Sequence, residues 1–176
     1  MTVAISSEKT AGLKILFVDD DLTALEELND IVDLEGWNSV SASCVETALD
    51  MLEADLDIQI VVTDVHFIDP AGKSANGIQF VSRAQARFPD RPISYLVLSG
   101  DPDAVNSSVQ VGAFNFLSKP FFAEDLIDAI KSAAASGGGE RENASEIYKL
   151  VRNAGSKNDQ FGDVEINSRS SRTGNR

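Results

Sequence analysis

Four apolar runs of the sequence each end in polar side chains that could take part in chemistry. These side chains belong to the pair Asp19 and Asp20, to Asp64, to Ser99 and to Lys119. If the runs are parallel strands, their carboxyl ends open on one crevice, and residues far apart in the chain meet there. Three neighbouring carboxylates repel one another unless a cation offsets them, and oxygen clusters of this kind usually hold a hard cation such as Mg²⁺. The pattern therefore predicts phosphoryl chemistry.

The elements that would position these groups alternate between strand and helix along the chain. Strands are predicted at 14–18, 37–42, 58–63, 93–98 and 113–117, and helices at 22–34, 43–52, 77–84, 101–111 and 122–135. Ser43 and Glu46 fit a capping box at the start of the second helix. The stretch Phe67–Asn76, which contains proline and glycine, is typical of a loop. Five such units predict an α/β fold with right-handed crossovers and a parallel sheet covered on both faces.

Length and charge limit the classes of protein that this chain can represent. A chain of 176 residues has room for one domain of ordinary size and a tail. The net charge of the whole chain is −13, but residues 1–136 carry 8 Lys and Arg against 22 Asp and Glu, a net charge of −14, so the acidity belongs to this part. Such acidity disfavours direct nucleic-acid binding and favours basic or cation-bearing partners. No run reaches the ~18 apolar residues of a membrane span, and the first ten residues lack a signal peptide's apolar centre, so a cytoplasmic location is expected.

The ends of the chain differ in composition from its centre. The run Gly137–Gly139 breaks the strand and helix pattern, and the following residues are rich in Asn, Ser, Gly and charged side chains. We therefore expect a flexible N-terminus at 1–12, a folded domain at 13–136 and a mostly disordered tail at 137–176. The apolar residues Ile147, Leu150 and Val151 have helical spacing in this tail and could form a short helix or a docking motif.

The motifs of the central region resemble the receiver domain of bacterial two-component response regulators. The resemblance covers Leu13 to Ala135 and rests on ILFVDD, on the strand that ends at Asp64, on VLS and on FLSKPF, in this order. It implies a flavodoxin-like (βα)5 doubly wound parallel sheet with strand order 2-1-3-4-5. It also implies a signalling domain that is no enzyme beyond its own phosphorylation and dephosphorylation.

The resemblance assigns roles to the polar residues one by one. Asp64 is similar to the phosphoacceptor, which takes a phosphoryl group from a histidine kinase or a phosphotransfer protein. Asp20 resembles a direct Mg²⁺ ligand, and Asp19 resembles the acid that acts through water or orients the ion. Asp64 and the main-chain carbonyl of His66 complete the metal ligands that this resemblance implies. Lys119 should pair with a phosphoryl oxygen.

Further residues match the parts that transmit the signal in the family. Pro120 implies a cis bond after Lys119. Ser99 matches the switch hydroxyl and Phe116 the aromatic switch residue, so phosphorylation would act on a loop-and-helix arrangement. The output surface, and a homodimer if one forms, would lie on the fourth helix, fifth strand and fifth helix. The downstream protein target is unknown from the sequence.

This chain also departs from the pattern of the family. Twelve residues separate Asp64 from Gly77, so the loop between them is longer than in most receivers. The extra length could reshape kinase docking or cover the site. Phe116 lacks the hydroxyl on which a tyrosine switch relies. His66 and Asp101 occupy positions that line the water path to the phosphoryl group in the family, and we expect them to tune dephosphorylation.

Three other functions compete with a stand-alone receiver that acts as a switch or phosphorelay element. One is a Mg²⁺-dependent phosphatase or phosphotransferase that uses Asp64 as nucleophile, although His66 stands where such enzymes commonly have a second acid. Another is an interaction module that keeps the fold but is not phosphorylated. A third is that the chain is the receiver of a longer protein, with 137–176 as linker.

Overall fold

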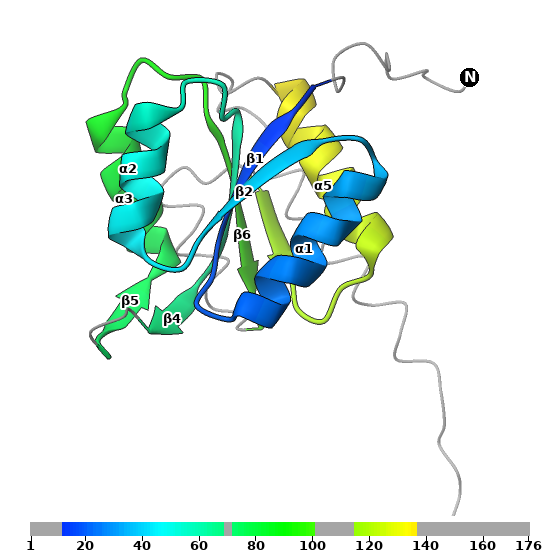
Figure 1. Cartoon of the computed structure of the whole chain (residues 1–176), viewed down its shortest axis with the longest axis horizontal. Helices are drawn as coiled ribbons and strands as arrows, with labels where there is room; N and C mark the ends of the chain where they lie inside the picture. The colour runs from blue at the N-terminus through cyan, green and yellow to red at the C-terminus, as the bar shows by residue number, and fades with distance from the viewer. Residues whose placement is uncertain (1–11, 69–71, 101–114, 137–176) are drawn as a thin grey trace, which may run out of the picture.

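A five-stranded parallel sheet forms the centre of the protein (Figure 1). The computed structural model describes residues 12–68, 72–100 and 115–136. The strands are β1 (Lys14–Val18), β2 (Asn38–Ala42), β3 (Ile60–Asp64), β6 (Ser94–Ser99) and β7 (Asn115–Ser118). They lie in the order β2-β1-β3-β6-β7 and pair in parallel. Because β6 and β7 are the fourth and fifth strands of this sheet, the predicted order 2-1-3-4-5 is confirmed.

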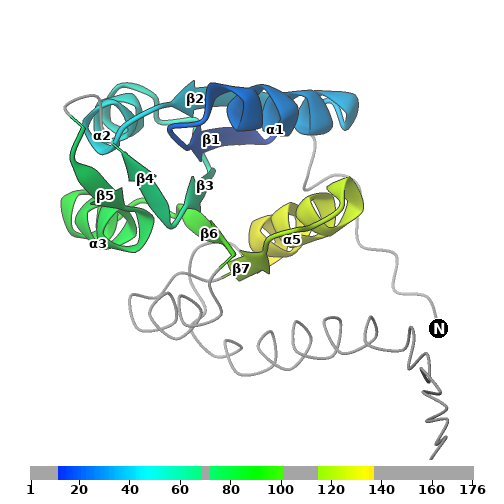
Figure 2. The ribbon, with the colours of Figure 1, turned by 90° about the horizontal axis from the view of Figure 1, so that it is seen from below.

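Helices cover the sheet on both faces, as the doubly wound prediction requires. They are α1 (Leu22–Leu34), α2 (Val45–Ala54), α3 (Gly77–Arg87) and α5 (Ala123–Ser136). One face carries α2 and α3, and the opposite face carries α1 and α5, with the sheet between the two layers (Figure 2). The carboxyl ends of the strands are therefore left open between the layers, where ligands bind in folds of this kind.

The strand β1 shows why its sequence is a continuous apolar run. Leu16 and Val18 pack into the core beneath α2 and α3, whereas Ile15 and Phe17 pack into the core beneath α1 and α5. All four side chains are less than 2% exposed. A central parallel strand buries both of its faces, so both alternating sets of side chains must be apolar.

The start of α2 differs from the predicted capping box. Its N-cap is Cys44, whose side chain makes no capping hydrogen bond, and Glu46 is the second helical residue rather than the third. The prediction that Ser43 caps the helix is wrong because the helix begins one residue later, with Val45 buried in the core. Cys44 is itself buried, and its Sγ lies 3.1 Å from Oγ1 of Thr47, so it acts as a packing residue at the start of the helix.

The long segment after β3 contains a hairpin, so the prediction of a loop at Phe67–Asn76 is wrong in part. The strands β4 (His66–Ile68) and β5 (Ser74–Asn76) pair antiparallel and project from the end of the sheet near α3 (Figure 1). The physical reason is Phe67, which is 3% exposed and joins the core beneath α2 and α3. Its burial fixes the alternation of the strand and directs its neighbours to the other face.

Some expectations fall on parts of the chain that the structure does not describe. Residues 1–11, 69–71, 101–114 and 137–176 lie outside the described ranges. The expected fourth helix, the expected disordered tail, the apolar stripe at 147–151 and the role of Asp101 therefore stay predictions. Within the described ranges, no helix has the length and apolar character that crossing a bilayer requires.

The buried phenol of Tyr95 on β6 gives a pH-dependent prediction for the fold. Tyr95 is 3% exposed, and its burial raises its pKa from 10.0 to about 12. Between these values the unfolded chain has lost the proton that the native state keeps, so stability falls as pH rises through this range. We expect a loss of roughly 2 to 3 kcal/mol in urea unfolding between pH 10 and 12. The variant Tyr95→Phe should lack this part of the loss, and an equal loss in both proteins would contradict the assignment.

Candidate functional site

Asp64 ends β3, and its two carboxylate oxygens have different partners. Oδ1 lies 2.8 Å from Nζ of Lys119, and Oδ2 accepts a hydrogen bond of 3.1 Å from the main-chain N–H of His66. The side chain of Asp64 is only 15% exposed. One oxygen therefore faces an ammonium and the other a neutral amide donor, which holds the carboxylate in one orientation. Asp64 and Lys119 thus lie together, as the positions of their strand ends predicted.

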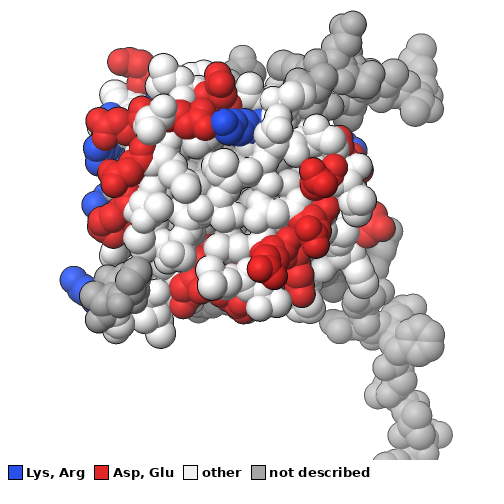
Figure 3. Space-filling model, viewed as in Figure 1, with Lys and Arg blue, Asp and Glu red and all other residues white. Residues whose placement is uncertain are grey.

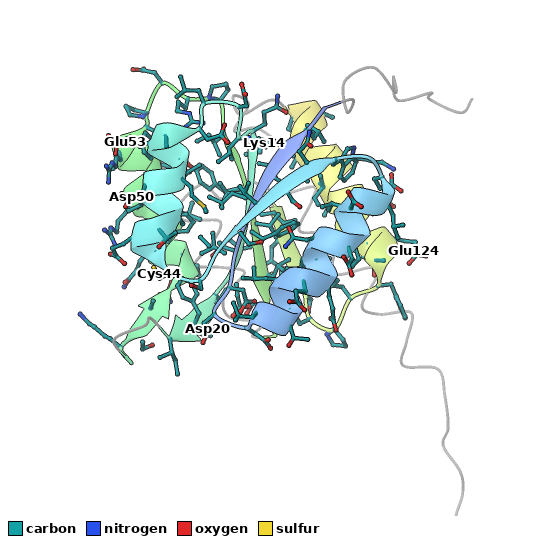
Figure 4. The ribbon with its side chains drawn as sticks, in the orientation of Figure 1. Lys14, Asp20, Cys44, Asp50, Glu53 and Glu124 are labelled. Atoms are coloured by element: carbon teal, nitrogen blue, oxygen red, sulfur yellow. The ribbon has the colours of Figure 1, made fainter. Side chains whose placement is uncertain are left out.

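Asp19 and Asp20 follow β1, and the structure uses them differently. Asp19 is 5% exposed, its Oδ2 lies 3.8 Å from Nζ of Lys119, and its Oδ1 accepts a hydrogen bond from the N–H of Asp21. Asp20 is exposed, and its Oδ2 accepts a hydrogen bond of 3.1 Å from the N–H of Ile68 in β4. Figure 4 places Asp20 at the start of α1, beside the hairpin. Asp19 thus joins Asp64 and Lys119 directly, whereas Asp20 is tied to the hairpin.

The remaining predicted residues lie on the neighbouring strands β6 and β7. Ser99 ends β6 and is buried, and its main-chain carbonyl accepts a hydrogen bond of 2.8 Å from the N–H of Lys119. The bond between Lys119 and Pro120 is cis, as the resemblance implied. Phe116 lies on β7, and its half-buried ring packs against the hydrophobic core beneath α2 and α3. The backbone therefore joins Ser99 to Lys119, while Phe116 belongs to the packing behind them.

Gly77 is a site residue that the sequence reasoning missed. A Cβ added to it would lie 1.9 Å from the main-chain oxygen of Asp64 and 2.8 Å from Oγ1 of Thr63. The N–H of Gly77 also donates a hydrogen bond of 2.8 Å to the carbonyl of Val65. Glycine is therefore required where α3 begins against the end of β3. A glycine directly after Asn76, which caps α3, was the signal in the sequence, but spacing alone does not reveal this contact.

The electrostatics of the cluster are unbalanced toward negative charge. Burial raises the pKa of the Asp19 carboxyl above its ordinary value, and the charges of Asp64 and Asp20 act in the same direction. The hydrogen bond from Asp21 and the charge of Lys119 oppose this rise of the pKa. Two carboxylates, of Asp19 and Asp64, thus share one ammonium, with the charge of Asp20 close by, and the excess of negative charge favours a further cation.

The carboxylates do not form a closed metal cage by themselves. Among the described residues, no three side chains of His, Cys, Asp or Glu are grouped as a set that could hold a metal ion. Mg²⁺, however, commonly uses one or two carboxylates together with waters and phosphate oxygens. The N–H of His66 faces Asp64, and the N–H and carbonyl of a strand residue point to the same edge, so this carbonyl can add a neutral oxygen ligand. The donor set fits an open Mg²⁺ site.

The surface around the site is acidic on the side of α1. Figure 3 shows Asp and Glu gathered over α1, whereas Lys and Arg are mixed with them over α2 and α3. There, Arg83 pairs with Glu46 at 3.2 Å, and Arg87 pairs with Glu53. The exposed acids of α1 are Glu26, Glu27, Asp30 and Asp33. The negative surface is thus concentrated on α1, where it would repel the phosphates of a nucleic acid.

Comparison with known proteins decides the family. The family model described as the response regulator receiver domain matches residues 15–131, which include every residue of the site. The chain belongs to the response regulator receiver family. This family is a family of signalling domains, and the receiver fold agrees with the observed strand order and with the cluster at the carboxyl ends of its strands.

Related proteins and solved structures agree with the receiver assignment. The receiver is similar to the transcriptional regulatory protein TdiR of Thauera aromatica, at 30% identity over 74% of this chain and 56% of TdiR. It is 26% identical to a chemotaxis protein CheY homolog of Campylobacter jejuni, over 73% of this chain and 97% of the homolog. A crystal structure of a receiver domain protein from Clostridium thermocellum is 27% identical and covers 70% of this chain and 95% of its own, with a TM-score of 0.62. The chain thus spans little more than half the length of TdiR.

The close approach of Gly77 to Asp64 predicts the effect of a single methyl group. Gly77→Ala should destabilise the receiver by about 1 to 3 kcal/mol, because backbone atoms must move to admit the Cβ. It should also shift the backbone NMR signals of Asp64 and Val65. Gly100→Ala is the matched control, since a Cβ at Gly100 meets no atom of the described residues within 4 Å and its φ lies outside the left-handed region. Equal stability of the two variants would contradict the argument.

The buried charge of Asp19 predicts a stabilising substitution. In a buffer with EDTA near neutral pH, Asp19→Asn should raise the unfolding temperature by several degrees, because it removes a desolvated negative charge. Because the pKa of Asp19 is raised in the folded state, the wild type loses stability as pH rises from the ordinary pKa of an Asp to the pKa of Asp19 in the folded protein. The difference in unfolding temperature between Asp19→Asn and the wild type should therefore shrink in acid. The exposed Asp30 of α1 provides the control Asp30→Asn, which should change the temperature little. A lower unfolding temperature for Asp19→Asn at neutral pH would reject this explanation.

Proposed function

We propose that this receiver accepts a phosphoryl group on Asp64 and acts as a signalling switch through protein contacts. The observation that carries the proposal is the contact of 2.8 Å between Asp64 Oδ1 and Lys119 Nζ, in a cluster that also holds Asp19. A half-buried carboxylate beside an ammonium is placed to attack phosphorus, because the ammonium can leave the carboxylate and pair with a phosphoryl oxygen instead. Within this proposal, the folded domain is 13–136, and the segments 1–12 and 137–176 lie outside it.

The transfer step follows from the groups at the end of β3. An oxygen of Asp64 forms the new P–O bond while the P–N bond of a phosphohistidine on the donor breaks. The imidazole nitrogen keeps the electron pair of that bond, and the product on this chain is an acyl phosphate. The amide of His66 holds the second oxygen of Asp64, so the carboxylate stays oriented during the attack. The donor is a histidine kinase or a phosphotransfer protein, which places this chain and its donor together in the cytoplasm.

We assign the divalent cation of this step to the oxygens around Asp64. Asp20 and Asp64 would hold Mg²⁺ directly, Asp19 would hold it through water or by orientation, and the carbonyl of His66 would complete the share of the protein. When bound, Mg²⁺ offsets negative charge on the phosphoryl oxygens. The raised pKa of Asp19 agrees with this assignment, because burial is its main cause and the charges of Asp64 and Asp20 add to it, and a cation beside these carboxylates would offset both effects.

The change after phosphorylation is assigned to Ser99 and Phe116. Ser99 ends β6, the strand next to β3, and its main-chain carbonyl accepts a hydrogen bond from Lys119, which follows β7. A movement of the Ser99 hydroxyl toward the new phosphoryl group would therefore shift the end of β7. Phe116 lies on β7 beside Val97 and would change its rotamer with it. The output face would comprise the fourth helix, β7 and α5, and would serve a downstream protein or a second copy. The solution structure of the beryllofluoride-activated NtrC4 receiver domain, solved as a dimer and 26% identical to this chain, supports the latter.

Intact mass spectrometry tests the phosphoacceptor. With Mg²⁺ and a small acyl phosphate such as acetyl phosphate, the wild type should gain the mass of one phosphoryl group, and Asp64→Asn should gain none. Asp30→Asn is the matched control, because it changes an exposed carboxylate of α1 in the same way and should be phosphorylated like the wild type. EDTA should suppress the gain in every protein.

Other outcomes of this experiment identify the competing functions. Sustained hydrolysis of an unrelated phosphoester, lost in Asp64→Asn, would favour the Mg²⁺-dependent phosphatase or phosphotransferase. No mass gain with acetyl phosphate or with phosphoramidate would favour an interaction module that is not phosphorylated. A gain that persists in Asp64→Asn would place the phosphoryl group on another residue and reject the proposal.

A further inference from the structure

The outer edge of β4 donates hydrogen bonds to two carboxylates of the site. The N–H of His66 donates to Oδ2 of Asp64, and the N–H of Ile68 donates to Oδ2 of Asp20, both at 3.1 Å. These two amides are two residues apart, and alternate residues of a strand direct their N–H groups to the same edge. One short strand therefore contacts the nucleophile at the end of β3 and the acid after β1.

The pairing of the hairpin explains why these amides are available. The N–H of Gly77 donates to the carbonyl of Val65, so the residues that bond across the hairpin are Val65 and, two residues later, Phe67. His66 and Ile68 alternate with them and direct their amides away from β5. The bond from Ile68 to Asp20 thus takes nothing from the pairing between the two strands.

The hairpin is anchored firmly enough to act as a support. At its beginning, the N–H of Val65 donates a hydrogen bond of 3.1 Å to the carbonyl of Leu98 in β6. In its middle, Phe67 is buried in the core beneath α2 and α3. At its end, Oδ1 of Asn76 accepts hydrogen bonds from the first turn of α3, the nearer of them from Ile78 at 2.9 Å. Sheet, core and helix therefore fix the position of β4.

We propose that β4 is a positioning element of the cation site, in which the main-chain N–H of Ile68 holds the carboxylate of Asp20 in its ligand orientation. Asp20 is exposed, so without this bond its carboxylate would sample several rotamers and would have to be ordered when a cation binds. The side chain of Ile68 is 57% exposed, and the role belongs to the backbone. This inference rests on the proposed function, because it assigns Asp20 to the cation.

A proline at position 68 removes the donor selectively. Proline lacks the N–H, and on the outer edge of a strand it breaks no pairing hydrogen bond. Ile68→Val is the matched control, because it shortens the exposed side chain and keeps both the amide and the β-branched shape. Calorimetric titration with MgCl₂ should show about tenfold or greater loss of Mg²⁺ affinity for Ile68→Pro, as for other groups that orient a metal ligand. Ile68→Val should bind like the wild type.

A second readout separates positioning from a general loss of structure. In EDTA the unfolding temperatures of wild type, Ile68→Pro and Ile68→Val should be similar, and the rise produced by added MgCl₂ should be smaller in Ile68→Pro alone. If the proline variant does not fold, an amide-to-ester replacement at Ile68 removes the same N–H with the native side chain, and it should show the same loss of affinity.

The outcomes distinguish this inference from the proposed function. Wild-type affinity in the proline or ester variant, or an equal loss in Ile68→Val, overturns the role of the Ile68 amide and leaves the phosphoryl acceptor in place. A wild-type protein that binds no Mg²⁺ and gains no phosphoryl group overturns the proposed function and this inference together. Loss of affinity in the proline and ester variants, with phosphorylation of the wild type, supports both.

Discussion

The contact of Lys119 with Asp64 and Asp19 is the interaction on which the arrangement of the site depends. It joins the ends of three strands, because Asp19 follows β1, Asp64 ends β3 and Lys119 follows β7. Carboxylates so close together repel one another strongly in a half-buried crevice unless an opposing charge offsets them. The ammonium therefore lets the protein keep two carboxylates side by side, those of Asp64 and the buried Asp19, at a cost in stability that the cores on both faces of the sheet offset.

Much of the fold and part of the site could be predicted from the sequence. Runs such as Ile15–Val18 and Ile60–Thr63 are apolar on both alternating sets of positions, which is a strong signal of a buried parallel strand. Once these strands were placed side by side, the rule for their carboxyl ends brought Asp19, Asp64 and Lys119 together. The prediction succeeded because it depended on the position of strand ends, and strand ends are marked by abrupt changes from apolar to polar residues.

The features that escaped prediction depend on contacts that no local pattern records. The strands of the hairpin are three residues long, and in His66–Ile68 only the middle residue is buried. The alternation of buried and exposed residues is therefore too short to recognise in the sequence. The register of α2 depended on burying Val45, which outweighed the capping signal of Ser43. A Cβ at Gly77 would clash with the main-chain oxygen of Asp64, thirteen residues earlier in the chain. Only the folded backbone brings these two positions together, so no local pattern in the sequence reveals the constraint.

In β4 the main chain of Ile68 contacts the site while its side chain faces solvent, and this separation affects how the protein could diverge from its relatives. The backbone of Ile68 contacts Asp20, but its side chain points away from the core and is largely in solvent. Selection can therefore replace that side chain with almost any other residue except proline without changing the hydrogen bond. The surface beside Asp64 could then acquire new partners over time while the hydrogen bonds of the site stay constant, so recognition and the geometry of the site would evolve independently although they share one strand.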